Sequence, residues 1–254
     1  MTNIQAYAGT QAVVRCLRLL KLFHAAPELS LAQLRERSGL NRSTAFRILT
    51  ALESEGMIER DVRREVYRLG PQIAALGRRA AGEGDLRELA RREMESLALR
   101  LHETVTIETL AASDVVIVGE AMGDRVLGML PSLGTSWPAH ATSTGKVLLA
   151  ALAPAERDRL LRGRLRAVTP RTTTTKRALT EELERVRARG WAASVEELEP
   201  GFVAVAVPVV DANGRTLAAL SLGGPKHRLP DAEHEALARE LARSAAAITA
   251  ELGG

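Results

Sequence analysis

Hydrophobic residues recur at helical spacing near the start of the chain and predict two helices there. A first helix is predicted over residues 10–26, with apolar positions at Val13, Cys16, Leu17, Leu20 and Phe23. Ser30 and Gln33 have the spacing of a capping box, which predicts a second helix ending at Gly39.

A third helix and a hairpin follow. Asn41 is a good N-cap residue, and Gly56 is suited to the position just after a helix. Only three residues, 39–41, separate the second and third helices, so the two must cross steeply, as in a helix-turn-helix. Residues 57–69 alternate between apolar and polar positions on either side of residues 61–64, which predicts a two-stranded wing.

The rest of the chain mixes helical and strand-like periods. Helices are predicted at 71–81, 85–102, 145–152, 154–161, 179–189 and after Pro230, and strands at 105–110, 115–121, 126–130, 202–210 and 216–222. The sequence GEGD at 82–85 indicates a hinge, and DANG at 211–214 a hairpin turn. We therefore predict an α+β protein in three parts: a winged helix-turn-helix domain (1–70), a linker helix with hinge (71–83) and an antiparallel sheet flanked by helices (84–254).

Charge is unevenly distributed between these parts. The 254 residues carry a net charge of +4, but residues 1–80 hold 13 Lys and Arg against 7 Asp and Glu, while the remainder holds 22 against 24. A basic first third on a slightly acidic remainder is the pattern of a nucleic-acid-binding domain joined to a domain with another task.

The single cysteine and the hydropathy pattern limit the compartment. Cys16 alone excludes an intramolecular disulfide and any site built from several thiolates. No run of about 18 apolar residues occurs, and the N-terminus lacks the order of a secretory signal. We expect a cytoplasmic protein with no membrane partner.

The third helix and the wing present groups suited to double-stranded DNA. A recognition helix presents its first residues to the major groove, where arginine binds guanine with two hydrogen bonds. Wing arginines typically contact phosphates. Phe46 either touches a thymine methyl or packs under the wing. The predicted DNA-binding residues are Arg42, Ser43, Thr44, Phe46, Arg47, Arg63 and Arg64.

Two later segments carry a resemblance. The segments PAHATSTGKVLLA, from Pro138, and WAASVEELEPGFVAVAVPVVDANGRTLAALSLGGP, from Trp191, resemble the IclR family of bacterial transcriptional regulators, as does the winged helix. The resemblance extends over about residues 11–252. It implies a GAF-like effector-binding domain and a homodimer or dimer of dimers on operator DNA, with no cofactor.

The resemblance also implies an effector pocket. Carried over by position, the pocket consists of Val126, Met129, Ser143, Thr144, Ser194, Ala204, Ser221 and Gly223. A helix start near Ser143 favours an anion, so the expected effector is an organic carboxylate. The resemblance implies that members binding small oxo-acids often have an acidic residue where this chain has Ser194, and can have a second hydroxyl where it has Gly223. We therefore expect fewer polar groups in the cavity and an aromatic or alicyclic acid as ligand.

Three enzymatic or metal-binding interpretations are less well supported. TGK at 144–146 lacks the upstream glycine and following hydroxyl of a phosphate-binding loop. His140, Ser143 and Glu196 or Glu197 suggest a hydrolase, but no nucleophile elbow surrounds the serine. The five histidines lack metal-binding spacing. We predict no enzyme and no metal.

A rival function of another class remains open at this point. The winged helix would then bind a protein, and the C-terminal domain would sense a small molecule without any contact to DNA. Steep loss of DNA affinity with rising salt distinguishes the two, because contacts with phosphates release counterions.

Overall fold

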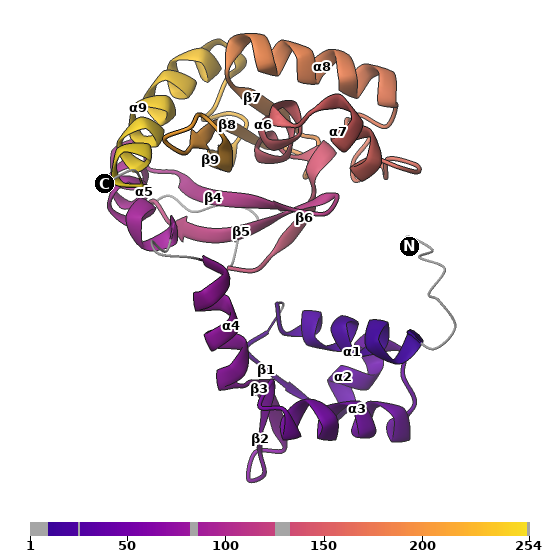
Figure 1. Cartoon of the computed structure of the whole chain (residues 1–254). Coiled ribbons are helices and arrows are strands. Elements are labelled where there is room, and N and C mark those ends of the chain that lie inside the picture. The colour runs from indigo at the N-terminus through magenta and orange to yellow at the C-terminus, as the bar shows by residue number, and fades with distance from the viewer. Residues whose placement is uncertain (1–9, 25, 82–85, 125–132, 253–254) are drawn as a thin grey trace. The chain divides into compact units, whose positions relative to one another are not determined.

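The chain folds into two compact units, Met1–Glu83 and Gly84–Gly254 (Figure 1). The computed structural model describes residues 10–24, 26–81, 86–124 and 133–252. The hinge predicted at 82–85 and the strand predicted at 126–130 lie outside the described residues. Among the helices in these ranges, none is long and apolar enough to cross a membrane.

The N-terminal unit consists of helices and a small three-stranded sheet of order β1-β3-β2. Its elements are α1 (Gln11–Lys21), β1 (Glu28–Ser30), α2 (Leu31–Ser38), α3 (Arg42–Ser54), β2 (Ile58–Asp61), β3 (Val66–Leu69) and α4 (Pro71–Ala81). The helix-turn-helix, the hairpin of β2 and β3 and a helix at 71–81 thus form where the sequence predicted them.

Local hydrogen bonds explain where α2 and α3 begin. The Ser30 hydroxyl accepts from the Gln33 backbone N–H, and the Gln33 side chain accepts from the Ser30 N–H, which completes the capping box. The Asn41 side chain accepts from the Thr44 N–H at 2.8 Å. Leu34, Leu49 and the other core residues of this unit then pack between the helices and the sheet.

The first helix differs from its prediction in length and orientation. It ends at Lys21, and a 3-10 turn (Leu22–His24) follows, rather than a continuous helix to residue 26. Leu19 is fully buried, whereas Val13 and Leu17 are 58% and 52% exposed. The apolar stripe is therefore wider than this unit's core needs, and part of it faces outward.

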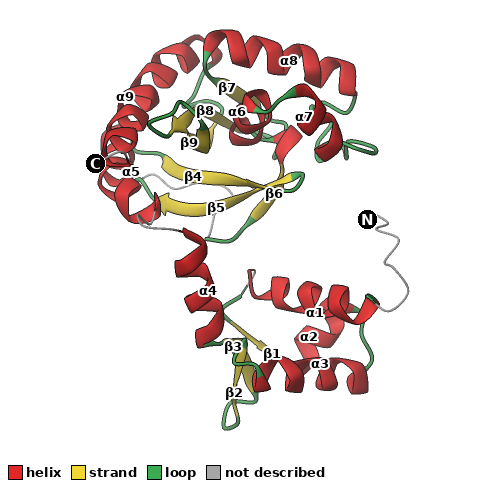
Figure 2. Cartoon of the chain, in the orientation of Figure 1, coloured by secondary structure: helices red, strands yellow, loops and turns green. Residues whose placement is uncertain are grey.

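The C-terminal unit is an antiparallel six-stranded sheet of order β6-β5-β4-β9-β8-β7, with helices on both faces (Figure 2). Its strands are β4 (Thr104–Ala111), β5 (Asp114–Ala121), β6 (Ser136–Pro138), β7 (Ala192–Val195), β8 (Phe202–Val210) and β9 (Thr216–Pro225). Its helices are α5 (Leu86–Leu101), α6 (Ser143–Ala151), α7 (Pro154–Leu160), α8 (Lys176–Arg189) and α9 (His234–Leu252).

Alternation along the central strands separates the two faces of this sheet. In β4, Val105 and Ile107 enter the core shared with α5 and α9, as do Leu220 and Leu222 in β9. The residues between them point to the opposite face, on which α6 and α8 pack. That second face holds the pocket described below.

Three short strands were not predicted from the sequence. Strands β1, β6 and β7 have only three or four residues each, too few to show a clear alternation.

Helix α8 begins earlier than predicted. It starts at Lys176 rather than at residue 179, because the Thr175 side chain caps it. These elements depend on tertiary pairing or on a cap that the pattern did not reveal.

Candidate DNA interface and ligand pocket

Helix α3 presents an open polar face. Arg42, Ser43 and Arg47 are exposed and Thr44 is half-buried, while Ala45 and Leu49 on the other side are buried. No ion pair involving Arg42 or Arg47 occurs among the described residues. Their guanidinium groups are therefore available for an external partner.

The wing carries arginines in two different states. The Asp61 carboxylate accepts from the backbone N–H groups of Arg63 and Arg64 and orders the turn. Arg64 makes a double ion pair with Glu28, with N–O distances of 2.6 and 2.7 Å. Arg63 is exposed and has no ion pair among the described residues. Arg64 would thus have to share or leave Glu28 to contact a phosphate.

Phe46 lies on the outer face of α3 and is 47% exposed. It lines a groove together with Arg42 of the same helix and Arg60 and Tyr67 of the wing. Both predicted contacts of Phe46, with the wing and with DNA, are therefore compatible with this position. The ring adjoins the wing and still offers about half of its surface outward.

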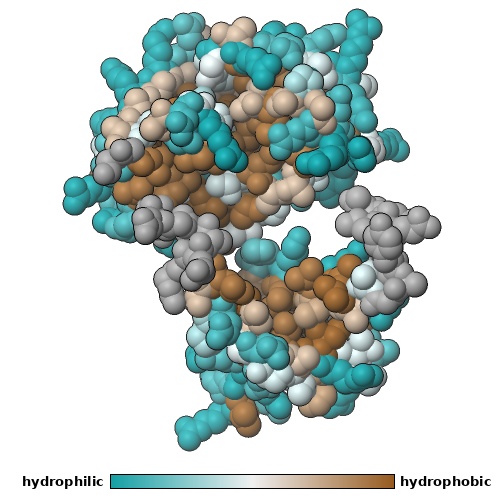
Figure 3. Space-filling view, in the orientation of Figure 1, coloured by the Kyte–Doolittle hydropathy of each residue, from teal (hydrophilic) through white to brown (hydrophobic). Residues whose placement is uncertain are grey.

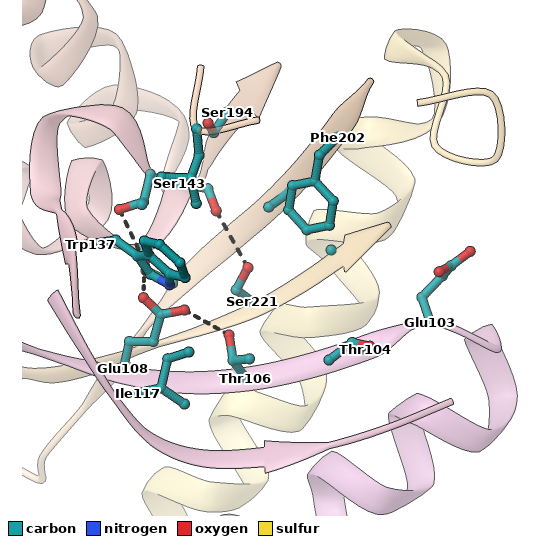
Figure 4. Close-up of a pocket in the computed structure, with 15 residues that line it drawn as sticks. Glu103, Thr104, Thr106, Glu108, Ile117, Trp137, Ser143, Ser194, Phe202 and Ser221 are labelled. Atoms are coloured by element: carbon teal, nitrogen blue, oxygen red, sulfur yellow. Dashed lines mark hydrogen bonds between the residues drawn. The ribbon is translucent and has the colours of Figure 1, made fainter. Parts of the chain in front are cut away.

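The pocket of the C-terminal unit lies between the sheet and the start of α6 (Figure 4). Its lining residues are Glu103, Thr104, Thr106, Glu108, Ile117, Trp137, Thr142, Ser143, Thr144, Ser194, Leu198, Phe202, Ala204, Ser221 and Gly223. Six of the eight predicted pocket residues are among them. The other two, Val126 and Met129, lie outside the described residues.

Strand register explains why these distant residues meet. Ser194 pairs with Ala204, Ala204 with Gly223, and Gly223 with Thr104, so one row crosses four strands. One step along the sheet, Thr106 pairs with Ser221. Residues in register on neighbouring strands point to the same face of a sheet.

The start of α6 closes one side of the pocket. The Thr142 hydroxyl accepts from the Gly145 N–H at 3.0 Å and caps the helix. The Ser143 and Ser221 hydroxyl oxygens are 3.4 Å apart. The Ser194 hydroxyl instead bonds to the backbone. It donates to the Ala141 carbonyl and so holds β7 against the segment before α6.

Two ion pairs, one buried and one partly buried, join segments of the chain that carry lining residues. The Lys146 ammonium pairs with Glu197 and donates to the Ala193 carbonyl at 3.1 Å. The Arg228 guanidinium binds both carboxylate oxygens of Glu103. The first pair ties α6 to the loop after β7, and the second ties the start of β4 to the segment after β9. The Lys146 ammonium is thus engaged by groups of the protein itself.

The pocket also contains polar side chains that the sequence analysis did not name. Glu108, Thr104 and Thr106 of β4 all face the pocket. The Glu108 carboxylate accepts from Thr106 at 2.8 Å and from Thr144 at 2.6 Å, and burial raises its pKa, although both hydrogen bonds oppose the rise. In the sequence VTIETL, alternating polar residues are equally typical of a strand that faces solvent, so the pattern did not single them out.

Neither rival chemistry gains support from the described residues. The His140 ring hydrogen-bonds to the Arg166 carbonyl at 2.9 Å rather than to Ser143. Within the same part of the chain, no three histidine, cysteine, aspartate or glutamate side chains gather as they would around a metal ion.

Comparison with known proteins identifies the family. Residues 78–250 match the family described as bacterial transcriptional regulator IclR C-terminal, and residues 12–62 match the IclR helix-turn-helix domain. The chain belongs to the IclR family of bacterial transcriptional regulators. It is a DNA-binding regulator that responds to a ligand, and the protein-interaction alternative is not favoured.

Individual relatives in the IclR family cover nearly the whole chain. The HTH-type transcriptional regulator XynR of Escherichia coli is 33% identical over 96% of this chain and 97% of its own length. An IclR transcriptional regulator from Alicyclobacillus acidocaldarius is 30% identical with a TM-score of 0.77, covering 95% and 98% of the two chains. An IclR homologue from Microbacterium hydrocarbonoxydans, solved in complex with 4-hydroxybenzoate, is 27% identical with a TM-score of 0.79, covering 95% and 99%.

Proposed function

We propose that the exposed face of α3 reads operator DNA and that the pocket beside α6 binds the effector. The observation that carries the first half is that Arg42 and Arg47 are exposed on the outer face of a helix that follows a three-residue turn, with no ion pair among the described residues. Ser43, Thr44 and Phe46 complete the base-reading face, and Arg63 and Arg64 of the wing bind phosphates. This role implies a cytoplasmic protein without catalytic activity.

We propose an organic carboxylate as the effector, held at the first turn of α6. The positive end of the helix dipole and the hydroxyls of Ser143 and Ser221 favour an anion there. Trp137 and Phe202 supply an apolar wall for the carbon skeleton. The relative bound to 4-hydroxybenzoate supports an acid of this size.

We propose a homodimer as the form that binds DNA, with a dimer of dimers as the alternative. Two recognition helices must enter major grooves about 34–36 Å apart or at a multiple of that distance. The outward apolar residues Val13 and Leu17 of α1 and Leu76 of α4, each more than half exposed, offer a surface for a second copy. Figure 3 shows hydrophobic surface gathered over α1.

Two substitutions separate the two halves of this proposal. Arg47→Ala should weaken binding of upstream DNA and leave effector binding unchanged, because Arg47 belongs to the other unit. Ser221→Trp should fill the pocket and abolish effector binding while DNA binding persists. Ser221→Ala removes only the hydroxyl, and it tests the same position if the tryptophan variant does not fold.

Fluorescence anisotropy of labelled promoter DNA and calorimetry with a panel of acids measure the two activities. Matched controls are Arg177→Ala, an exposed arginine of α8, and Ser244→Ala, a buried serine of α9 outside the pocket. DNA affinity should fall steeply with salt, and Arg63→Ala should reduce the salt slope by about 1. A flat salt response, or equal loss of both activities in each variant, would contradict the proposal.

A further inference from the structure

Glu108 is a buried carboxylate that lines the pocket and has no basic partner among the residues that the structure describes. It is 6% exposed and lies at an irregularity in β4, where the pairing with β5 shifts between Ile107 and Glu108. The carboxylates of the two ion pairs described above, Glu103 and Glu197, each have a cationic partner. No lysine, arginine or histidine is among the described lining residues.

The two threonine hydroxyls that donate to Glu108 do not exhaust its capacity. Each carboxylate oxygen can accept two hydrogen bonds, and each accepts one side-chain bond here, from Thr106 or Thr144. In Figure 4, a dashed line joins the Glu108 carboxylate to the Thr106 hydroxyl. Burying such a group without a cation destabilises a fold, so its presence facing a cavity suggests a binding role.

The surroundings favour a hydroxyl as the missing donor. Thr144 connects Glu108 to the start of α6. Its hydroxyl donates to the Glu108 carboxylate, and its backbone belongs to the first turn of that helix. A second carboxylate in the pocket would add a negative charge near the Glu108 carboxyl group, which is bonded to Thr144. A ligand hydroxyl would donate to Glu108 without adding a second charge.

On the basis of the effector site proposed above, we infer that Glu108 accepts a hydrogen bond from a hydroxyl group of the effector. The pocket then selects hydroxylated carboxylic acids over the same acids without the hydroxyl. An acid lacking the hydroxyl leaves the Glu108 carboxylate desolvated with one donor fewer, and this cost is the source of the discrimination.

The test compares matched pairs of acids by calorimetry on the full-length protein. The pairs are 4-hydroxybenzoate with benzoate, gluconate with hexanoate, and lactate with propionate. In the pair that fits best, the hydroxylated acid should bind about 10- to 100-fold more tightly, the range expected for a hydrogen bond to a charged group. Benzylamine, a cation, tests whether the pocket binds a positively charged ligand more tightly than the acids.

Glu108→Gln keeps the side-chain shape and removes the charge, so it should reduce this ratio at least several-fold. Glu120→Gln is the matched control, because Glu120 is on the neighbouring strand β5 and is not a lining residue; it should leave the ratio unchanged. Circular dichroism checks that both variants are folded.

Several results would overturn the inference. Equal affinity within every pair, an unchanged ratio in Glu108→Gln, or tighter binding of benzylamine than of any hydroxylated acid would each do so. If both members of a pair bind equally and release promoter DNA, the effector site stands and only the role of Glu108 fails. If no acid binds, the proposed effector class fails with it.

Discussion

At the scale of single residues, burial decides the behaviour of Glu108. Desolvation raises the pKa of its carboxyl above the usual value of 4.5. As pH rises from 4.5 toward this higher pKa, the unfolded chain loses the proton while the folded protein keeps it. The free energy of unfolding should therefore fall with rising pH across that window.

Glu108→Gln removes this contribution, so its stability relative to wild type should increase as pH rises from 4.5. Urea denaturation at a series of pH values measures the difference. Glu196→Gln provides a comparison of opposite sign, because hydrogen bonds from Lys226 and from the Gly201 N–H lower the pKa of Glu196. A pH-independent difference for Glu108→Gln would refute the assignment.

At the scale of elements, the sequence predicted the helices of the N-terminal unit because their signals are local. Ser30, Asn41 and Gly56 act within a few residues of themselves. The pocket residues of β4 were missed for the opposite reason. Whether Thr106 and Glu108 face solvent or a cavity depends on α6, which is more than thirty residues away in sequence.

The start of α6 also depends on a close approach that only glycine permits. A Cβ atom on Gly145 would lie 2.1 Å from the Ala139 carbonyl oxygen. Gly145→Ala should therefore cost about 1–3 kcal/mol of stability, as overpacking does elsewhere, and should weaken effector binding at the shifted helix start.

Gly77→Ala is the matched substitution in α4, where an added Cβ meets nothing within 4 Å. It should stabilise that helix by about 0.5–1 kcal/mol, because alanine is the better helix former. Thermal denaturation of both variants checks the pair. A Gly145→Ala protein as stable as wild type would show that residue 139 yields without cost.

At the scale of the whole molecule, the exposed apolar face of α1 predicts self-association. Leu17→Glu places a charge on this face without touching the core of its own unit, since Leu17 is 52% exposed. The variant should dissociate at concentrations where wild type is dimeric and should lose DNA affinity, because two linked half-sites bind more tightly than one. Analytical ultracentrifugation measures the first effect and anisotropy the second.

Leu99→Glu is the control, because Leu99 is 69% exposed on α5 in the other unit. It should leave DNA affinity in place. Dimers that persist in Leu17→Glu would contradict the proposed surface.

The sequence by itself determined the α+β class and the winged helix, and its resemblance to the IclR family pointed to six of the residues that line the pocket. Capping residues, helical and strand periods and turn signals are short-range, and the motifs around Ser143 and Ser221 are continuous in the chain. Tertiary structure alone decided which face of α1 stays exposed, that Arg64 pairs with Glu28, and that Glu108 is buried beside Thr144. Each of these outcomes depends on packing between segments far apart in sequence, and a local pattern is the same whether its polar side meets water or another part of the protein.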